Sequence, residues 1–113
     1  MLRRMALQEP TFLILTSLAQ GRRHGYALLK DAETLSGGRV SLKVGTLYAA
    51  LDRLTTEGLV ETAGEEVVDG RLRRFYVLTE EGAATLAADV DRMRSLANHA
   101  ATRLSERPGL AFA

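Results

Sequence analysis

The 113-residue chain contains no cysteine. It therefore forms no disulfide scaffold, no thiolate metal site and no cysteine nucleophile, and it fits a reducing cytoplasm. Long hydrophobic runs are missing too, since no apolar stretch approaches the roughly 18 residues that a membrane span needs. The start Met1–Arg4 has the charge of a signal peptide, but the apolar stretch 12–18 is short and contains Thr16 and Ser17. We interpret this stretch as a core helix and expect no contact with a membrane.

Sequence patterns of enzymes and metal sites are missing as well. The two histidines, His24 and His99, lie far apart, and neither has an acidic residue at ligand spacing. The sequence has no P-loop, no HExxH pattern and no GxSxG pattern. We therefore expect no enzymatic activity, no metal and no cofactor. His24 is interpreted as a residue at the start of a helix or in a turn.

Charge is nearly balanced in total but uneven along the chain, whose formal net charge is +1. Residues 20–53 hold six positive against three negative side chains, and residues 69–78 hold three arginines against one acid. Residues 79–91 hold four acids and no base. A basic middle indicates a polyanionic partner for part of the surface, although a solvated mixed surface would give the same pattern.

The hydrophobic pattern predicts one domain with an appendage. Stop signals at Gly21, Gly37 and Gly58 end the first three expected helices. The pair Asp69-Gly70, flanked by stretches rich in Val, Tyr and Thr, predicts a hairpin with a type I′ turn, and Thr79 is placed to cap the last helix. The expected helices span 10–20, 24–35, 43–57 and 79–106, and the expected strands span 59–68 and 71–78.

This order of elements is that of a winged helix-turn-helix, a mainly α fold with a small β-hairpin. The plan places the third helix in the DNA major groove and leaves the hairpin, called the wing below, to reach the flanking backbone or minor groove. We expect residues 1–78 to form the DNA-binding domain and residues 79–107 to form a C-terminal dimerisation helix. Residues 108–113 are expected to be a disordered tail.

Two helices have more apolar surface than one small domain needs. The first is apolar nearly all round over residues 12–18, so one side is expected to face a second chain. The last is about 27 residues long and has apolar or small residues in steps of four and three, as in a coiled-coil seam. The alternative is a helix that lies on its own domain. The predicted dimer-interface residues are Phe12, Leu15, Leu86, Val90, Met93, Ala97, Ala100 and Leu104.

The third helix has the residue types of a helix that reads DNA. Opposite its three leucines it presents small or hydroxyl side chains, which let a helix approach base edges closely. Thr46 can bond a phosphate or a base, and Gly45 lets the helix start come near a phosphate. Tyr48 is expected to donate to a phosphate, with simple packing as the alternative. The predicted contacts on this helix are Lys43, Gly45, Thr46, Tyr48, Ala49 and Arg53.

The wing carries three arginines at and after its turn, Arg71, Arg73 and Arg74. Arginine suits phosphate groups and the negative potential of a narrow minor groove. Strict alternation puts Arg74 on the same inward face as Tyr76, so Arg71 and Arg73 are the stronger candidates for DNA contacts. The alternative is pairing across the hairpin with Glu65, Glu66 or Asp69.

The chain also carries five short motifs in a fixed order. They are His24-Gly25-Tyr26, Gly45-Thr46-Leu47-Tyr48, Asp52-Arg53-Leu54, Glu57-Gly58-Leu59-Val60, and Arg73-Arg74-Phe75-Tyr76-Val77-Leu78-Thr79 followed by Glu81-Gly82. Together these motifs resemble the PadR family of bacterial transcriptional regulators, over about residues 7–105. The single long C-terminal helix is similar to that of the smaller PadR subfamily.

The resemblance implies a homodimer, built from the first and last helices, that binds an inverted-repeat operator. It usually implies a repressor released by a small molecule, and family members respond to phenolic acids or toxic aromatic compounds. It also implies contacts to the DNA backbone from Tyr48, Arg71 and Arg73. Two features depart from the family: Val44 stands where proline is common, and the chain has no tryptophan, so no indole pair can sandwich a flat ligand.

Two other functions are weighed against this one. A winged helix used as a protein-interaction module needs no basic wing. A small-molecule-binding dimer with incidental DNA affinity would bind its ligand without changing its affinity for an operator. The expected partners are therefore double-stranded DNA, a second copy of the chain and a small-molecule effector.

Overall fold

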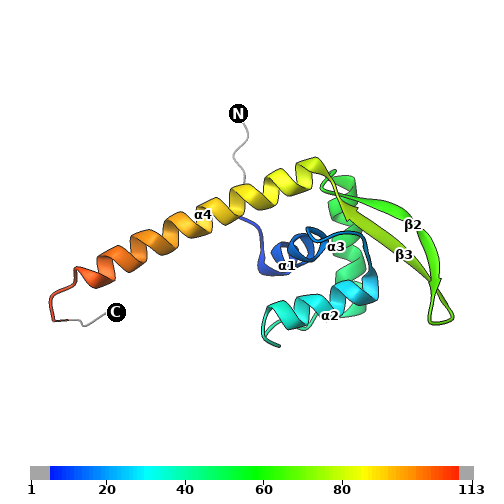
Figure 1. Cartoon of the computed structure of the whole chain (residues 1–113), viewed down its shortest axis with the longest axis horizontal. Coiled ribbons are helices and arrows are strands. Elements are labelled where there is room, and N and C mark those ends of the chain that lie inside the picture. The colour runs from blue at the N-terminus through cyan, green and yellow to red at the C-terminus, as the bar shows by residue number, and fades with distance from the viewer. Residues whose placement is uncertain (1–5, 110–113) are drawn as a thin grey trace.

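The computed structural model describes residues 6–109. The chain forms a mainly helical fold with one small antiparallel sheet, which confirms the predicted fold class (Figure 1). Of the predicted tail, residues 110–113 lie outside the described residues. The elements are α1 Glu9–Leu18, β1 Arg23–His24, α2 Gly25–Leu35, α3 Val44–Thr56, β2 Val60–Val68, β3 Arg71–Leu78 and α4 Glu80–Ser105.

The predicted helices and hairpin strands are all present, with ends that differ from prediction by at most two residues. The largest difference is at the end of α1, which was expected to reach Gln20. The helix stops at Leu18, because the backbone N–H of Ala19 closes its last turn and Gly21 then adopts a positive φ of 139°. Glycine tolerates this conformation because it lacks a Cβ atom.

The core lies where α1, α2 and α3 meet the base of the sheet. Each helix contributes aliphatic side chains at helical spacing, and β3 adds the ring of Tyr76. Apolar contacts between these elements stabilise the fold, at roughly 25 cal/mol for each Å² of apolar surface removed from water. The fully buried core residues include Ile14, Leu15, Leu28, Leu47, Leu51 and Leu54.

The sheet has a strand that the sequence analysis missed. The two-residue strand β1 pairs with β3, with Arg23 opposite Tyr76 and His24 opposite Phe75, and gives the strand order β1-β3-β2. Two residues are too few to show a periodic pattern. His24 then caps α2, since its Nδ1 accepts a hydrogen bond of 3.3 Å from the backbone N–H of Ala27. This confirms the expectation that His24 starts a helix.

The wing is the hairpin of β2 and β3, and it projects beyond the helical body (Figure 1). Its turn has positive φ at both central residues, 51° at Asp69 and 76° at Gly70, as the predicted type I′ turn requires. The pairing shifts register between Thr62 and Glu65, where Gly64 has a φ of 88°. Such an irregularity bends a strand, so it sets the direction of the outer wing.

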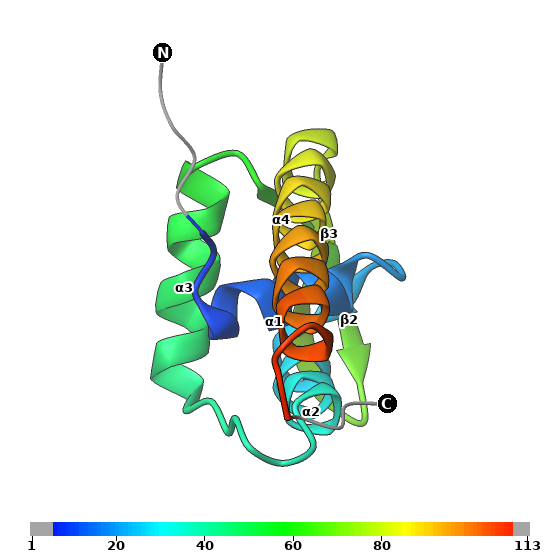
Figure 2. The ribbon, with the colours of Figure 1, turned by 90° about the vertical axis from the view of Figure 1, so that its left-hand side faces the viewer.

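Helix α4 starts from a tight junction with the body. The hydroxyl of Thr79 accepts a hydrogen bond from the backbone N–H of Gly82 (2.9 Å) and donates to the carbonyl of Gly58 (2.6 Å). Any Cβ atom at Gly82 would overlap the carbonyl oxygen of Leu59, so the helix can lie this close only with glycine there. From this junction α4 passes α1 and runs on away from the body (Figures 1 and 2).

Within residues 6–109 no helix has the length and apolar character needed to cross a membrane. In the same part of the chain, no three His, Asp or Glu side chains gather into a group that would hold a metal ion.

Candidate nucleic-acid interface

Helix α3 has one buried apolar face and one exposed face, as predicted. Its three leucines are fully buried, and the opposite face is open to solvent. Lys43 stands at the N-cap, with its side chain exposed before the first turn. All six predicted contacts of this helix are exposed, namely Lys43, Gly45, Thr46, Tyr48, Ala49 and Arg53. The face that they form is therefore accessible to a ligand as large as a DNA duplex.

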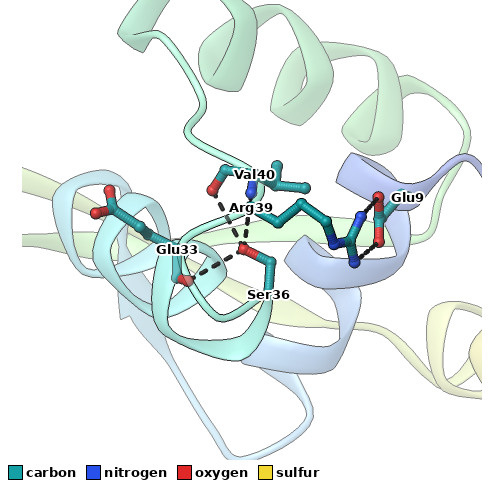
Figure 3. A network of polar contacts seen from close by, with 5 residues as sticks. All are labelled: Glu9, Glu33, Ser36, Arg39 and Val40. Atoms are coloured by element: carbon teal, nitrogen blue, oxygen red, sulfur yellow. Dashed lines mark hydrogen bonds and ion pairs between the residues drawn. The ribbon is translucent and has the colours of Figure 1, made fainter.

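The loop that leads into α3 is anchored at two places (Figure 3). The hydroxyl of Ser36 accepts a hydrogen bond from the backbone N–H of Val40 (2.9 Å) and lies 3.1 Å from the carbonyl oxygen of Glu33. The guanidinium of Arg39 donates two hydrogen bonds, of 2.8 and 2.5 Å, to the carboxylate of Glu9 on α1. This fork holds the pKa of Glu9 below its ordinary value and raises the pKa of Arg39.

Tyr48 lies against the start of α2. A Cβ atom at Gly25 would overlap the hydroxyl oxygen of Tyr48, so the absence of a side chain at Gly25 makes room for the phenol. The side chain of Tyr48 is still 39% exposed. The hydroxyl is therefore fixed beside a helix N-terminus, where the helix dipole favours an anion such as phosphate.

Arg53 is only partly free for DNA. Its guanidinium donates to the hydroxyl of Thr11 on α1 (3.0 Å) and lies 3.5 Å from the carboxylate of Glu57. One contact ties the side chain to α1, and the other ties it to the C-cap residue of α3.

Among the wing arginines, Arg74 is more exposed than Arg73, which is the opposite of what alternation alone suggests. Arg74 shares a strand face with buried Tyr76, as alternation requires, yet its side chain is 58% exposed because the wing extends beyond the core. Arg73 is the half-buried residue: its guanidinium lies 5.4 Å from the ring of Tyr26 on α2, and its Nε has no hydrogen-bond partner in the described part of the chain. Arg71 is exposed beside the turn. Arg74 therefore lies on the face that alternation predicts, but it is exposed there and not covered by the core.

A groove of about 360 Å³ joins the wing to α3. Leu72, Arg74 and Glu65 line its wing side, and Tyr48 and Asp52 line its helix side. Burial raises the pKa of Tyr76, which forms the floor where the two elements meet, and the positive charge of Arg74 partly opposes this rise. The two predicted halves of the DNA-binding surface therefore meet at a single concave surface.

Pairing of arginines across the hairpin, the alternative considered above, occurs in part. Arg74 lies 3.9 Å from the carboxylate of Glu65, directly across the strands. Both side chains are more than half exposed, so this pair contributes little and leaves Arg74 able to exchange Glu65 for a phosphate.

Arg22 fixes the wing to the body, a role that the sequence did not reveal. Its Nε donates to the carbonyl of Ala63 (2.9 Å), its Nη2 lies 2.5 Å from Glu66, and its guanidinium stacks 3.8 Å from the ring centre of Phe75. The three partners surround the irregular part of β2. The sequence signal that could have indicated an irregular strand here is Gly64, because a glycine inside a strand often marks a bulge.

The predicted dimer surface runs along α1 and α4. Phe12, Leu86 and Val90 are half-buried, whereas Met93, Ala97, Ala100 and Leu104 are exposed. In fact every residue of α4 from Asp91 onward is exposed. Leu15 is different: it has no exposed surface, because it packs inside the helical core. Leu15 is therefore a core residue and not a contact for a second chain.

The exposed face of α3, its anchored start and the wing beside it define a winged helix-turn-helix transcriptional regulator. The sequence profile of the Transcriptional regulator PadR-like family matches residues 14–88, and the chain belongs to this family. Members of the family are DNA-binding regulators and not enzymes, as the sequence analysis expected.

Relatives and solved structures agree with this assignment. Transcriptional regulator Rv3488 of Mycobacterium tuberculosis is 42% identical over 84 residues, which cover 74% of this chain and 75% of the relative. A PadR family regulator from Clostridium difficile has a similar structure, with a TM-score of 0.68, 27% identity, and coverage of 80% of this chain and 93% of that one. Bacillus subtilis PadR, solved in complex with operator DNA, matches with a TM-score of 0.63, 25% identity, and coverage of 72% of this chain and 47% of that one.

Proposed function

We propose that this regulator acts as a homodimeric repressor that binds an inverted-repeat operator through α3 and the wing. The observation that carries the proposal is the groove between α3 and the wing, where Tyr48 and Arg74 face one surface. The structural similarity to PadR of Bacillus subtilis, which was solved with operator DNA, supports the same ligand. We expect this regulator in the bacterial cytoplasm, because its operator lies in chromosomal DNA.

The roles of the site residues follow from their positions. Tyr48, Lys43, Arg71 and Arg74 contact phosphates, and Thr46 with Ala49 faces base edges in the major groove. Gly45 allows the helix start to approach the backbone, while Arg53 and Arg73 are secondary because each already has protein contacts. Residues 79–107 dimerise the chain.

The experiment is a mobility-shift titration with duplexes enriched from the host genome by the wild-type protein. Replacing Arg71 and Arg74 by glutamine should weaken binding to every duplex and reduce the slope of log K against log salt by about 0.9 for each lost phosphate contact. The matched control replaces Arg103, in the last turn of α4, and Arg107, beyond its end, and removes the same charge. Sedimentation equilibrium first checks that this control still forms the same dimer as the wild-type protein. Equal effects of the two double variants would contradict the assignment.

A small-molecule effector is the second part of the proposal. It is supported by a cavity of about 250 Å³ between α1 and α4, lined by Phe12, Leu13, Met93, and the charged pair Asp89 and Arg92. Asp89 is buried, and its Oδ1 accepts from Nε of Arg92 at 2.8 Å. A compound that binds here should release operator DNA. A compound that binds without changing operator affinity would instead favour a small-molecule-binding dimer.

A further inference from the structure

The first turn of α3, which the proposed function places against DNA, contributes no buried side chain to the body. Residues 43–46 are all exposed, and Leu47 is the first residue of the helix that is buried. The N-cap residue Lys43 makes no side-chain hydrogen bond to this turn, whereas His24 caps α2 and Thr79 caps α4. The direction of the first turn of α3 therefore depends on the loop before it.

The loop before α3 has little of its own to fix its conformation. Its residues 36–43 include none that is buried, and near its start Gly37 and Gly38 both have positive φ, of 65° and 82°. Glycine has more conformational freedom to lose than any other residue, so this pair needs contacts from outside to keep one shape. The hydroxyl of Ser36 fixes the near end of the loop, but it reaches only as far as Val40.

The fork from Arg39 to Glu9 joins this loop to a distant part of the body (Figure 3). Glu9 is the first residue of α1 and lies 30 positions before Arg39. Both terminal nitrogens of the guanidinium donate to the two carboxylate oxygens, and a bidentate pair of this kind fixes geometry as well as charge. The fork therefore holds the loop at a point between its glycine pair and the start of α3.

We propose that Glu9 and Arg39 are positioning residues for operator binding, which fix the direction of the first turn of α3 without touching DNA. The inference rests on the proposed function, since it needs α3 to bind a duplex. When the fork is open, the glycine pair lets this turn take several directions, of which one fits the major groove. Operator affinity is then reduced by the fraction of molecules that keep the fitting direction.

The proposal gives a negatively charged side chain a role that favours DNA binding. By charge alone, the loss of an acid strengthens the attraction to a polyanion, so Glu9→Gln would bind a duplex more tightly. If the fork positions α3, Glu9→Gln instead weakens operator binding, by about three- to fivefold. The matched control is Glu33→Gln, because Glu33 takes part in this network only through its backbone carbonyl oxygen (Figure 3). It removes the same charge beside the same loop and should not weaken binding.

A substitution of Arg39 separates positioning from a direct contact with phosphate. Arg39→Lys keeps the positive charge but cannot form the fork, because an ammonium group lacks the planar pair of donors. It should weaken binding as much as Glu9→Gln does, and the double variant should bind no more weakly than either single variant. The salt slope of all three should equal that of the wild-type protein, since no phosphate contact is lost.

Mobility-shift titrations with one duplex that the wild-type protein has enriched measure these affinities, and urea titrations check that each variant is folded at the temperature used. Three results would overturn the proposal: a Glu9→Gln variant that binds as tightly as Glu33→Gln, an Arg39→Lys variant that keeps the wild-type affinity, or losses that add in the double variant. Failure of the proposed function is distinct, since the wild-type protein would then shift no duplex.

Discussion

At the scale of single residues, two motifs that are separate in the sequence act as one unit in the structure. Gly25 makes room for the hydroxyl of Tyr48, so the conformation of the tyrosine depends on a glycine 23 positions earlier. The sequence analysis identified Tyr48 as a DNA contact but gave Gly25 no role. The role of Gly25 is to leave space for a neighbouring side chain. Such a role can be recognised only when the position of that side chain is known.

The substitution Gly25→Ala tests this dependence. The new methyl group displaces the end of an exposed side chain and not a buried one, so the free energy of unfolding should change by less than about 1 kcal/mol. Operator affinity should fall by about tenfold, as it should for Tyr48→Phe, because one hydrogen bond to a phosphate is lost. In the Tyr48→Phe background the alanine should have no further effect, which titrations of the four proteins would show. Additive losses would contradict the coupling.

Tyr76 gives a second residue-scale prediction, on pH. Burial raises the pKa of its phenol above the ordinary 10.0, so the folded state holds the phenolic proton more tightly than the unfolded state. The contribution of this phenol to the free energy of unfolding should therefore be fully present below pH 10. It should be lost as the pH rises above 10 toward the folded-state pKa. Urea titrations between pH 8 and 11 measure this, and Tyr76→Phe should flatten the alkaline slope. An unchanged slope in the variant would assign the alkaline loss to other groups.

At the scale of elements, the helices and the hairpin could be predicted because each has a local signal. Leucines at helical spacing defined α3, and Asp69-Gly70 defined the turn of the wing. The parts that could not be predicted depend on contacts between distant segments. β1 is too short for any pattern, Arg22 reaches residues more than 40 positions away, and the exposure of Arg74 depends on where the core ends.

The wing offers the element-scale prediction. Arg22→Gln removes the guanidinium that joins the irregular part of β2 to the ring of Phe75, so the outer wing loses its fixed direction. Hydroxyl-radical footprints should keep the protection beneath α3 and lose the protection beneath the wing, with operator affinity down about two- to fivefold.

The control for this experiment is Arg107→Gln, which removes the same charge beyond the end of α4 and should leave both parts of the footprint intact. Uniform weakening of the whole Arg22→Gln footprint would mean that Arg22 acts through charge or stability and not through the direction of the wing.

At the scale of the whole molecule, the elongated shape favours an interface between α4 and a second chain. The described chain extends 60 Å along its longest axis, and the outer part of α4 touches nothing in its own body. An exposed helix of this kind, with Met93 44% exposed and Leu104 38% exposed, gains stability when a partner helix covers its apolar residues. We expect α1 and α4 of two copies to form this interface.

A charge at the centre of the seam should separate the chains. Met93→Glu places an unpaired carboxylate from each copy in the interface, and dimerisation measured by sedimentation equilibrium should weaken by at least about a hundredfold. Ser95→Glu adds the same charge roughly on the opposite side of the helix and should leave the dimer intact. A dimer that tolerates Met93→Glu would place the interface elsewhere.

The most direct measurement of the central claim is a hydroxyl-radical footprint of the wild-type protein on an enriched genomic duplex. Two copies joined through α4 should protect two patches on one face of the duplex, one or two helical turns apart at about 34 Å per turn, with wing protection on the flanking backbone. A single patch, or none at salt concentrations low enough for non-specific binding, would contradict the account.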